Sequence, residues 1–206
     1  MVQNNRAIIF DFGNVLLDWN VRYLYRQFFH DEQSLSAFLD EIHFYQWNLQ
    51  LDAGKPFETG IRELSEMYPH WAEKIRLYDE RYPESVRGPI QGSANILLQL
   101  NQQGWPLFGL SNFNGPKFHS IRSQYPFFDV FCKIILSGEV GVIKPDPTIF
   151  QILLREIGYR PENCVFIDDS QPNIQTATTL GFDAILFKSP EDLARELALR
   201  GIEVTV

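Results

Sequence analysis

The strongest constraint on the fold is a set of five short apolar runs that recur along the chain. They cover residues 7–10, 106–110, 133–136, 164–167 and 184–187. Runs of this length without polar alternation are typical of strands that are buried on both faces of a sheet. Helical patterns over residues 93–102, 148–157 and 171–180 lie between the later runs. This alternation predicts an α/β fold, in which right-handed crossovers connect a doubly wound parallel sheet.

The interval from residue 20 to 85 follows a different pattern. It contains no strand-like apolar run, and its aromatic residues recur at helical spacing. The segment Asp52–Pro56, with a glycine and a proline, indicates a break between two helices. We therefore predict a core domain formed by residues 1–17 and 86–206, with a small α-helical cap over residues 18–85 inserted after the first strand.

Composition narrows the class of protein. The chain has 206 residues and a net charge of -8, which disfavours binding to nucleic acid or to anionic membranes. No apolar run approaches the roughly 20 residues that span a bilayer, and the N-terminus lacks a signal-peptide pattern. Cys132 and Cys164 both lie in apolar runs, so we expect buried free thiols. These features predict a cytoplasmic protein. We also expect a small-molecule partner and either a monomer or a homodimer, although the sequence does not distinguish between these two states.

Polar residues follow four of the predicted strands, directly or in the next loop. They are Asp11 after the first strand, Ser111 and Asn112 after the second, Lys144 beyond the third, and Asp168 and Asp169 after the fourth. One such residue alone would be typical of a helix cap or a turn. The carboxyl ends of parallel strands, however, converge at one edge of the sheet, where ligands bind. The set therefore predicts a binding site at that edge.

The charges of this set indicate its chemistry. Three carboxylates placed close together repel one another and raise their pKa values, and a divalent cation removes that repulsion. Mg²⁺ prefers hard oxygen ligands together with substrate phosphate. Lys144 adds positive charge for a phosphoryl group, and Ser111 adds a hydroxyl. The set therefore favours phosphoryl transfer, with Asp11 able to attack phosphorus as a covalent nucleophile.

Four segments resemble the motifs of the haloacid dehalogenase-like hydrolase superfamily, in the same order and at similar spacing. They are Phe10-Asp-Phe-Gly-Asn-Val-Leu16, Leu110-Ser-Asn112, Ser137-Gly-Glu-Val-Gly-Val-Ile-Lys-Pro-Asp146 and Val165-Phe-Ile-Asp-Asp-Ser170. The third and fourth are long and the most specific. The position of the helical insert is similar to that of subfamily IA, which carries a small helical cap. The resemblance implies a Rossmann-like core and a phosphatase that hydrolyses a small phosphate monoester, such as a sugar phosphate.

The resemblance also implies roles for individual residues. Asp11 would be the nucleophile and a ligand of Mg²⁺, with the backbone carbonyl of Gly13 and the carboxylate of Asp169 as further ligands. Asp168 would act through water or by orienting its neighbours. Ser111 and Lys144 would hold the phosphoryl oxygens during catalysis, and Asn112 could help to bind substrate through its backbone N–H.

Gly13 departs from the superfamily pattern. Most phosphatases of this superfamily carry an aspartate two residues after the nucleophile, where it serves as general acid and then as general base. Such catalysis is worth about 10²–10⁴-fold. The substrate could have a good leaving group, another side chain such as His43 or Asp18 could supply the proton, or the protein could be a poor catalyst. A glycine here also predicts a tight loop with positive φ.

Two other functions stay open from the sequence. A 2-haloacid dehalogenase also uses an aspartate nucleophile but needs no metal, and the pair Asp168-Asp169 disfavours it because an anionic substrate would be repelled. A weakly catalytic protein that binds a phosphorylated metabolite is kept open by Gly13. Within the cap, we expect the segment from His43 to Asn48 to face the site. Its aromatic rings could stack on a sugar or base, but for each ring packing within the cap is the favoured interpretation.

Overall fold

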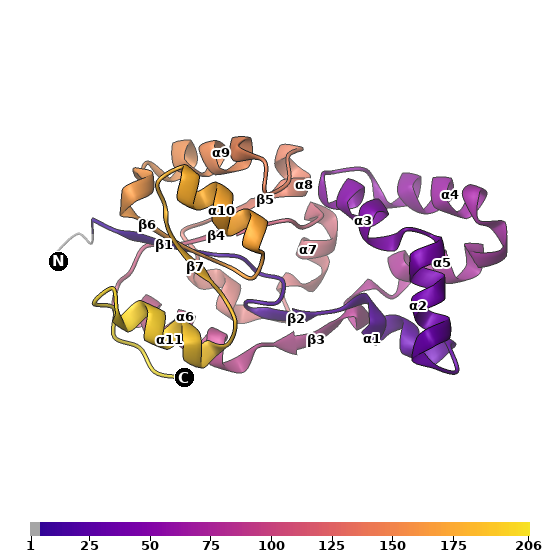
Figure 1. Cartoon of the computed structure of the whole chain (residues 1–206), viewed down its shortest axis with the longest axis horizontal. Coiled ribbons are helices and arrows are strands. Elements are labelled where there is room, and N and C mark those ends of the chain that lie inside the picture. The colour runs from indigo at the N-terminus through magenta and orange to yellow at the C-terminus, as the bar shows by residue number, and fades with distance from the viewer. Residues whose placement is uncertain (1–4) are drawn as a thin grey trace.

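A computed structural model describes residues 5–206 of the chain. Its main sheet has five parallel strands in the order β5-β4-β1-β6-β7 (Figure 1). The strands are β1 (Ala7–Phe10), β4 (Leu107–Ser111), β5 (Lys133–Leu136), β6 (Cys164–Asp168) and β7 (Asp183–Leu186). These bounds lie within one residue of the five apolar runs, which confirms the predicted α/β fold with a parallel sheet.

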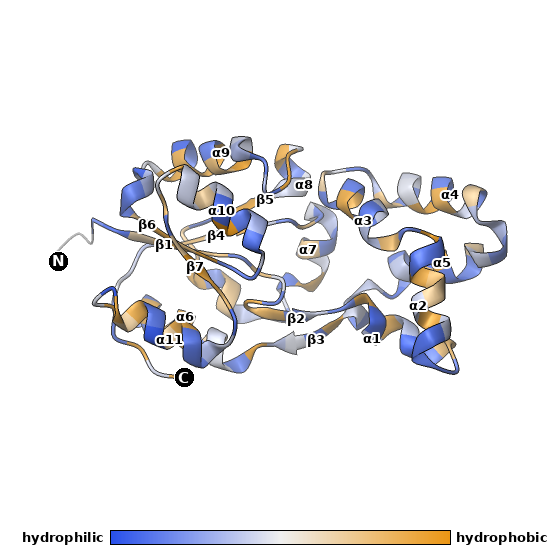
Figure 2. Ribbon diagram, in the orientation of Figure 1, coloured by the Kyte–Doolittle hydropathy of each residue, from blue (hydrophilic) through white to orange (hydrophobic). Residues whose placement is uncertain are grey.

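Helices cover both faces of this sheet (Figure 1). Those of the core are α6 (Gln91–Gln102), α7 (Gly115–Arg122), α8 (Ser137–Val140), α9 (Pro147–Ile157), α10 (Gln171–Thr179) and α11 (Pro190–Ala198). Side chains of β1 alternate between the two layers: Ile8 packs in the cluster that contains α6 and α11 residues, and Ile9 in the cluster that contains α9 and α10 residues. Because both faces of the strand are buried, its sequence is continuously apolar. Figure 2 shows that these helices contain both apolar and polar residues.

The chain between β1 and α6 forms a helical unit at one end of the molecule (Figure 1). Its helices are α1 (Val21–Tyr25), α2 (Glu32–Glu41), α3 (Phe44–Asp52), α4 (Phe57–Met67) and α5 (Ala72–Glu80). This unit also contains the short 3-10 turns η1 (Arg26–Phe28), η2 (Pro69–Trp71) and η3 (Tyr82–Ser85), whereas η4 (Pro126–Val130) and η5 (Pro161–Asn163) lie in the core. We call the helical unit the cap, with the boundaries of residues 18–85 kept as a prediction.

Two short strands join the cap to the sheet. They are β2 (Leu17–Trp19) and β3 (Val86–Pro89), which pair antiparallel. The sequence did not indicate this ribbon, because both strands are very short and only one residue in each is buried. The ribbon brings the entry and the exit of the cap together beside the carboxyl end of β1.

The C-terminal end of α3 docks on the core through backbone groups. Asn114 Nδ2 donates to the carbonyl oxygen of Leu51 at 3.0 Å, and Ser137 Oγ donates to that of Asp52 at 2.5 Å. Gly54 follows with a φ of +102°, and a Cβ placed on it would lie 2.9 Å from the Gly138 carbonyl oxygen. The predicted break after α3 thus lies where the cap contacts the loop after β4 and the first turn of α8.

The two cysteines differ in exposure. Cys164 is buried at the start of β6, as expected, but Cys132 is exposed. The expectation for Cys132 was wrong because its apolar neighbours reach the core while its own side chain, just before the edge strand β5, faces outward. Among the helices of the described residues, none has both the length and the apolar character needed to cross a membrane.

Candidate active site

Asp11 lies directly after β1, where the backbone turns sharply. The carboxylate is almost completely buried, and its Oδ1 accepts a hydrogen bond from the Phe12 N–H at 2.7 Å. The N–H groups of Leu16 and Leu17 donate back to the Phe12 carbonyl oxygen at 2.9 and 2.8 Å. The Phe12 ring anchors this turn against Phe118 and two further aromatic rings of the core. Asp11 is therefore presented at the edge of the sheet on a rigid loop.

The residue with positive φ in this turn is not Gly13. Asn14 has a φ of +55°, whereas Gly13 lies outside the left-handed region. The prediction of a positive φ at Gly13 was wrong, because the amide-bearing neighbour adopts that conformation instead. A Cβ placed on Gly13 would meet nothing within 4 Å. The glycine thus leaves open space beside the nucleophile position rather than relieving backbone strain.

Lys144 is the central cation of the site. Its side chain is 1% exposed, and Nζ lies 2.9 Å from Asp11 Oδ1 and 2.6 Å from Asp168 Oδ2. Nζ also donates to the Leu110 carbonyl oxygen at 2.9 Å. Burial disfavours the charge, but the two carboxylates outweigh burial and raise the pKa of Lys144 above its ordinary value. The lysine is therefore a fixed positive charge between β1 and β6.

The carboxylates at this edge differ in their surroundings. Burial raises the pKa of Asp11, Lys144 opposes the shift, and the charges of Asp168 and Asp169 add to it. Burial also raises the pKa of Asp169, with the charge of Asp168 as the next cause and a hydrogen bond from Asn14 opposing it. One oxygen from each of the three aspartates lies within 4.8 Å of the other two. The three predicted carboxylates thus lie together in space.

Asp168 has its acceptor capacity filled by neighbouring protein groups. Its Oδ1 accepts from the Ser170 N–H at 2.8 Å and from Asn173 Nδ2 at 2.9 Å, and its Oδ2 accepts from Lys144. Asp169, by contrast, is exposed at the same edge. The carboxylates with oxygens free for a cation are therefore those of Asp11 and Asp169. Asn173, which the sequence did not single out, holds Asp168 from the first turn of α10.

The residues after β4 support the same centre. Asn112 contacts the backbone of Lys144 in both directions, since Oδ1 accepts from its N–H at 2.7 Å and Nδ2 donates to its carbonyl oxygen at 2.9 Å. The sequence had suggested only the backbone N–H of Asn112 for binding. Ser111 ends β4, is 1% exposed and pairs with Leu136 of β5. It lies beside the loop that carries Asn112.

Two neighbouring cavities border this cluster. A cavity of about 360 Å³ is lined by Asp11, Lys144 and Asp169, among others. A second, of about 250 Å³, lies between the cap and the core and has walls from Trp19, Tyr82 and Phe113. Both are lined by Gly13, Leu49 and Asn112. The cavity lined by charged residues therefore adjoins the cavity lined by aromatic residues at Gly13.

The cap residues named from the sequence lie in different places. Tyr45 and Asn48 line the aromatic cavity, as expected for the segment from His43 to Asn48. Trp47 instead packs inside the cap, and His43 is exposed at the start of α3. Asp18 accepts a hydrogen bond from Tyr23 and lines neither cavity. The structure adds Asp52, which lines the aromatic cavity from the end of α3.

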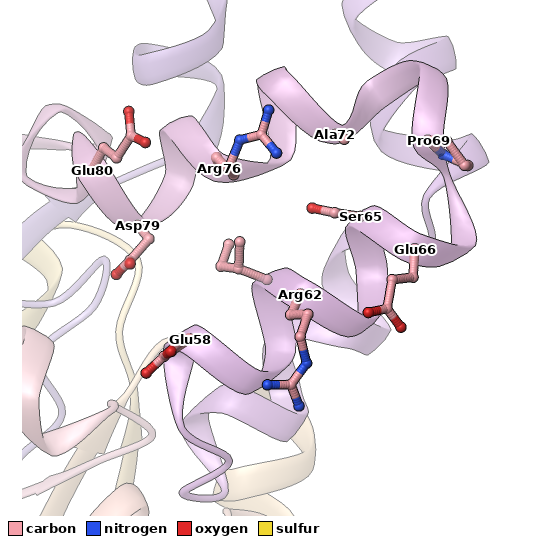
Figure 3. A pocket seen from close by; sticks show the side chains of 10 residues that line it. Glu58, Arg62, Ser65, Glu66, Pro69, Ala72, Arg76, Asp79 and Glu80 are labelled. Atoms are coloured by element: carbon pink, nitrogen blue, oxygen red, sulfur yellow. The ribbon is translucent and has the colours of Figure 1, made fainter.

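A larger cavity of about 580 Å³ lies between α4 and α5, away from this cluster. Figure 3 shows Arg62 and Arg76 extending away from each other on the two helices. Its rim carries both arginines and acidic side chains such as Glu58 and Glu66, all exposed. Charges of both signs in solvent give no convergent binding group. The buried cluster at the sheet edge is therefore the better candidate site, despite its smaller volume.

The model of a known family matches most of the chain. It is the haloacid dehalogenase-like hydrolase family, matched over residues 5–181. The chain is also 25% identical over 211 residues to the D-ribitol-5-phosphate phosphatase of Bacteroides thetaiotaomicron, covering 97% of this chain and 98% of that protein. Its identity to the sesquiterpene phosphatase astK of Aspergillus oryzae is 26% over 182 residues, covering 85% of this chain and 86% of astK.

A solved structure shows the same fold. The HAD family enzyme bt-2542 of Bacteroides thetaiotaomicron, in complex with magnesium and inorganic phosphate, matches with a TM-score of 0.74 and 23% identity, over 92% of this chain and 98% of that chain. Some curated relatives are longer, and the chain spans 38% of the length of one of them. The family match includes the four strand ends that form the site. This chain therefore belongs to the haloacid dehalogenase-like hydrolase family.

Proposed function

We propose that this chain is a magnesium-dependent phosphatase that hydrolyses a small phosphate monoester through a phospho-Asp11 intermediate. The observation that carries the proposal is the buried Lys144, whose Nζ contacts Asp11 at 2.9 Å and Asp168 at 2.6 Å. A fixed cation beside a carboxylate that borders a cavity suits a nucleophile that must approach an anionic phosphoryl group. The named phosphatase relatives support the same reaction class.

Magnesium fits the oxygen donors that the chain leaves free. Asp11 and Asp169, together with the backbone carbonyl of Gly13, would hold the ion, because Asp168 is already occupied by Lys144 and Asn173. When bound, Mg²⁺ supplies positive charge that offsets the carboxylates and the substrate phosphate. The magnesium and phosphate complex of bt-2542 supports this assignment.

Residues of the chain carry out the other steps of the reaction. Asp11 attacks phosphorus, and Lys144 stabilises the charge that spreads over the phosphoryl oxygens. Ser111 and the backbone N–H of Asn112 orient the same group from the end of β4. Water then hydrolyses the aspartyl phosphate and restores the Asp11 carboxylate. The position of these residues at the carboxyl edge of the sheet supports these roles.

The adjoining cavities suggest where the rest of the substrate lies. With the phosphoryl group at Asp11, the leaving group extends past Gly13 into the cavity between cap and core. A volume of about 250 Å³ limits that group to a small organic fragment, such as a sugar or a similar metabolite. The rings of Trp19 and Tyr82 offer apolar faces to it, and Asn48 offers an amide.

The proposal is tested by phosphate release from a panel of sugar, nucleotide and aryl phosphates, with and without Mg²⁺. We expect activity that needs the metal and that Asp11→Asn abolishes while the fold is kept. Full activity of Asp11→Asn on an aryl phosphate would falsify the mechanism. Negligible rates across the whole panel would favour a binding role, and chloride release from 2-chloropropionate in the presence of a chelator would favour a dehalogenase.

A further inference from the structure

The structure places a carboxyl group of the cap beside the space that Gly13 leaves open. Asp52 and Gly13 line the same cavity of about 250 Å³, although they come from different parts of the molecule. We propose that Asp52 is the general acid of this hydrolase: it gives a proton to the leaving oxygen and then takes one from the attacking water. This inference rests on the proposed phosphatase function and names the residue that replaces the side chain absent at Gly13.

The position of Asp52 is fixed by the docking of α3 on the core. Its own carbonyl oxygen accepts from Ser137 Oγ at 2.5 Å, and the carbonyl oxygen of Leu51 accepts from Asn114 Nδ2 at 3.0 Å. Ser137 Oγ in turn accepts from the Phe113 N–H at 2.9 Å. These bonds tie the end of α3 to the loop after β4, which also carries Asn112, and to the first turn of α8. The carboxyl group is therefore held at a set place relative to Asp11.

The side chain of Asp52 is also oriented. Asn48, one turn earlier on α3, donates from Nδ2 to Asp52 Oδ2 at 2.8 Å. The amide of Asn48 is fixed in turn by the hydroxyl of Tyr78, which donates to Asn48 Oδ1 at 2.8 Å. This chain of bonds runs from α5 to the cavity wall. It selects one orientation of the carboxyl group, as a proton donor in a catalytic site requires.

The surroundings of Asp52 keep its proton in place before the reaction. Burial raises the pKa of Asp52 to about 8, the Asn114 N–H opposes the shift, and the charge of Asp11 adds to it. The phenols of Tyr78 in α5 and Tyr82 in η3 also stay neutral, because burial raises their pKa values well above the ordinary value. A carboxyl group of this kind is protonated near neutral pH and can serve as an acid.

Asp52 loses one proton when the aspartyl phosphate forms and regains one when it is hydrolysed. In the first, Asp11 forms a bond to phosphorus, the bond from phosphorus to the leaving oxygen breaks, and that oxygen takes its electron pair and the proton of Asp52. In the second, water attacks phosphorus, its proton passes to the Asp52 carboxylate, and the bond to Asp11 breaks. Inorganic phosphate leaves, and Asp52 is again protonated.

The other candidates for this role do not reach the space. Asp18, on the ribbon, is engaged by Tyr23 at 2.7 Å and by Arg87 at 3.5 Å. His43 begins α3 and is exposed. Neither lines a cavity next to Gly13. Asp52, at the opposite end of the same helix as His43, does.

Dependence on the leaving group tests the proposal. For each phosphate ester, kcat/KM of Asp52→Asn is compared with that of the wild type, because this ratio reports the step in which the leaving group departs. We expect a loss of about 10²–10⁴-fold for alkyl phosphates, which need protonation of the leaving oxygen. For 2,4-dinitrophenyl phosphate, which leaves as a stable anion, the loss should stay below about tenfold. Asp40→Asn, an exposed carboxylate on α2, is the matched control and should leave both ratios unchanged.

A second variant places the acid at its usual position. A Cβ at Gly13 meets nothing within 4 Å, so an aspartate fits there. Adding Gly13→Asp to Asp52→Asn should therefore raise kcat/KM for alkyl phosphates at least about tenfold above that of Asp52→Asn alone. An equal loss on all esters, or full alkyl phosphate activity of Asp52→Asn, would overturn the role of Asp52. If Asp52→Asn does not fold, Asp52→Ser is compared in the same series. Activity that survives Asp11→Asn would instead refute the phosphatase mechanism itself.

Discussion

The amide of Asn112 holds the backbone of Lys144 on both sides, accepting from its N–H at 2.7 Å and donating to its carbonyl oxygen at 2.9 Å. These two bonds fix the loop from which Lys144 reaches Asp11. We predict that Asn112→Ala lowers kcat/KM by about 10–100-fold, because a misplaced supporting residue costs activity on that scale. Steady-state kinetics measure the loss.

Asn101→Ala is the control for that variant. Asn101 is exposed at the end of α6, remote from the site, and its substitution should leave kcat/KM unchanged. If Asn112→Ala kept wild-type activity, the paired bonds to Lys144 would not be needed to position the lysine.

Lys144 should also be needed for stability. Its ammonium group is the charge partner of two buried carboxylates, so Lys144→Met leaves both without compensation. We expect the free energy of unfolding to fall by about 3–5 kcal/mol, which is typical when one partner of a buried ion pair is removed. Urea unfolding at neutral pH measures the change.

A second substitution separates charge from packing in that experiment. Asp168→Asn in the Lys144→Met background removes one of the uncompensated charges and should recover part of the lost stability. Additive losses in the double variant would show that the charges of Lys144 and Asp168 do not stabilise the fold through each other.

Most of the fold could be predicted from the sequence. Strands β1, β4, β5, β6 and β7 are continuously apolar because both of their faces are covered, and short apolar runs that alternate with helical patterns are typical of a parallel sheet. Gly158 follows α9 in the left-handed conformation that the helix end requires. The ribbon of β2 and β3 was missed because strands this short and half exposed carry no periodic signal.

Only the part of the site at the carboxyl edge of the sheet could be predicted from the sequence. Asp11, Lys144 and Asp168 follow strands whose carboxyl ends must converge, so their proximity follows from the topology. The position of Asp52 in the site could not be predicted, because it depends on how α3 docks on the core. Its only signal was the break at Asp52–Pro56, and that segment indicated a turn without showing what the turn contacts.

The stability of the fold should depend on pH through Asp52. Burial raises the pKa of Asp52 from 3.8 to about 8, with the charge of Asp11 adding to the shift. Between these values the folded chain keeps a proton that the unfolded chain has lost. The contribution of Asp52 to stability is therefore present at low pH and declines as the pH rises from about 4 to about 8.

Asp52→Asn removes this contribution. As the pH rises from about 5 to about 8, the free energy of unfolding of the variant should increase by about 1–3 kcal/mol relative to that of the wild type. This change is smaller than the full pKa shift of Asp52 would give, because Asp52 is partly exposed. Urea unfolding with a chelator present, at both pH values, measures the difference. Parallel changes in the two proteins would mean that Asp52 is ionised in the folded chain.

Gly54 should control the docking of α3. Its φ of +102° and the 2.9 Å approach of the Gly138 carbonyl oxygen leave no room for a Cβ. We predict that Gly54→Ala lowers the free energy of unfolding by about 1–3 kcal/mol. It should also lower kcat/KM for alkyl phosphates more than for dinitrophenyl phosphate, because the strain displaces the helix end that carries Asp52.

Gly104→Ala separates the cost of a positive φ from the cost of the close contact with Gly138. Gly104 has a φ of +79° but nothing within 4 Å of its added Cβ, so its variant carries the conformational cost without the contact. It should lose about 1 kcal/mol of stability and keep the wild-type ratio of alkyl to dinitrophenyl rates. If Gly54→Ala behaved in the same way as Gly104→Ala in both measurements, the close approach of Gly54 to Gly138 would not position the cap for catalysis.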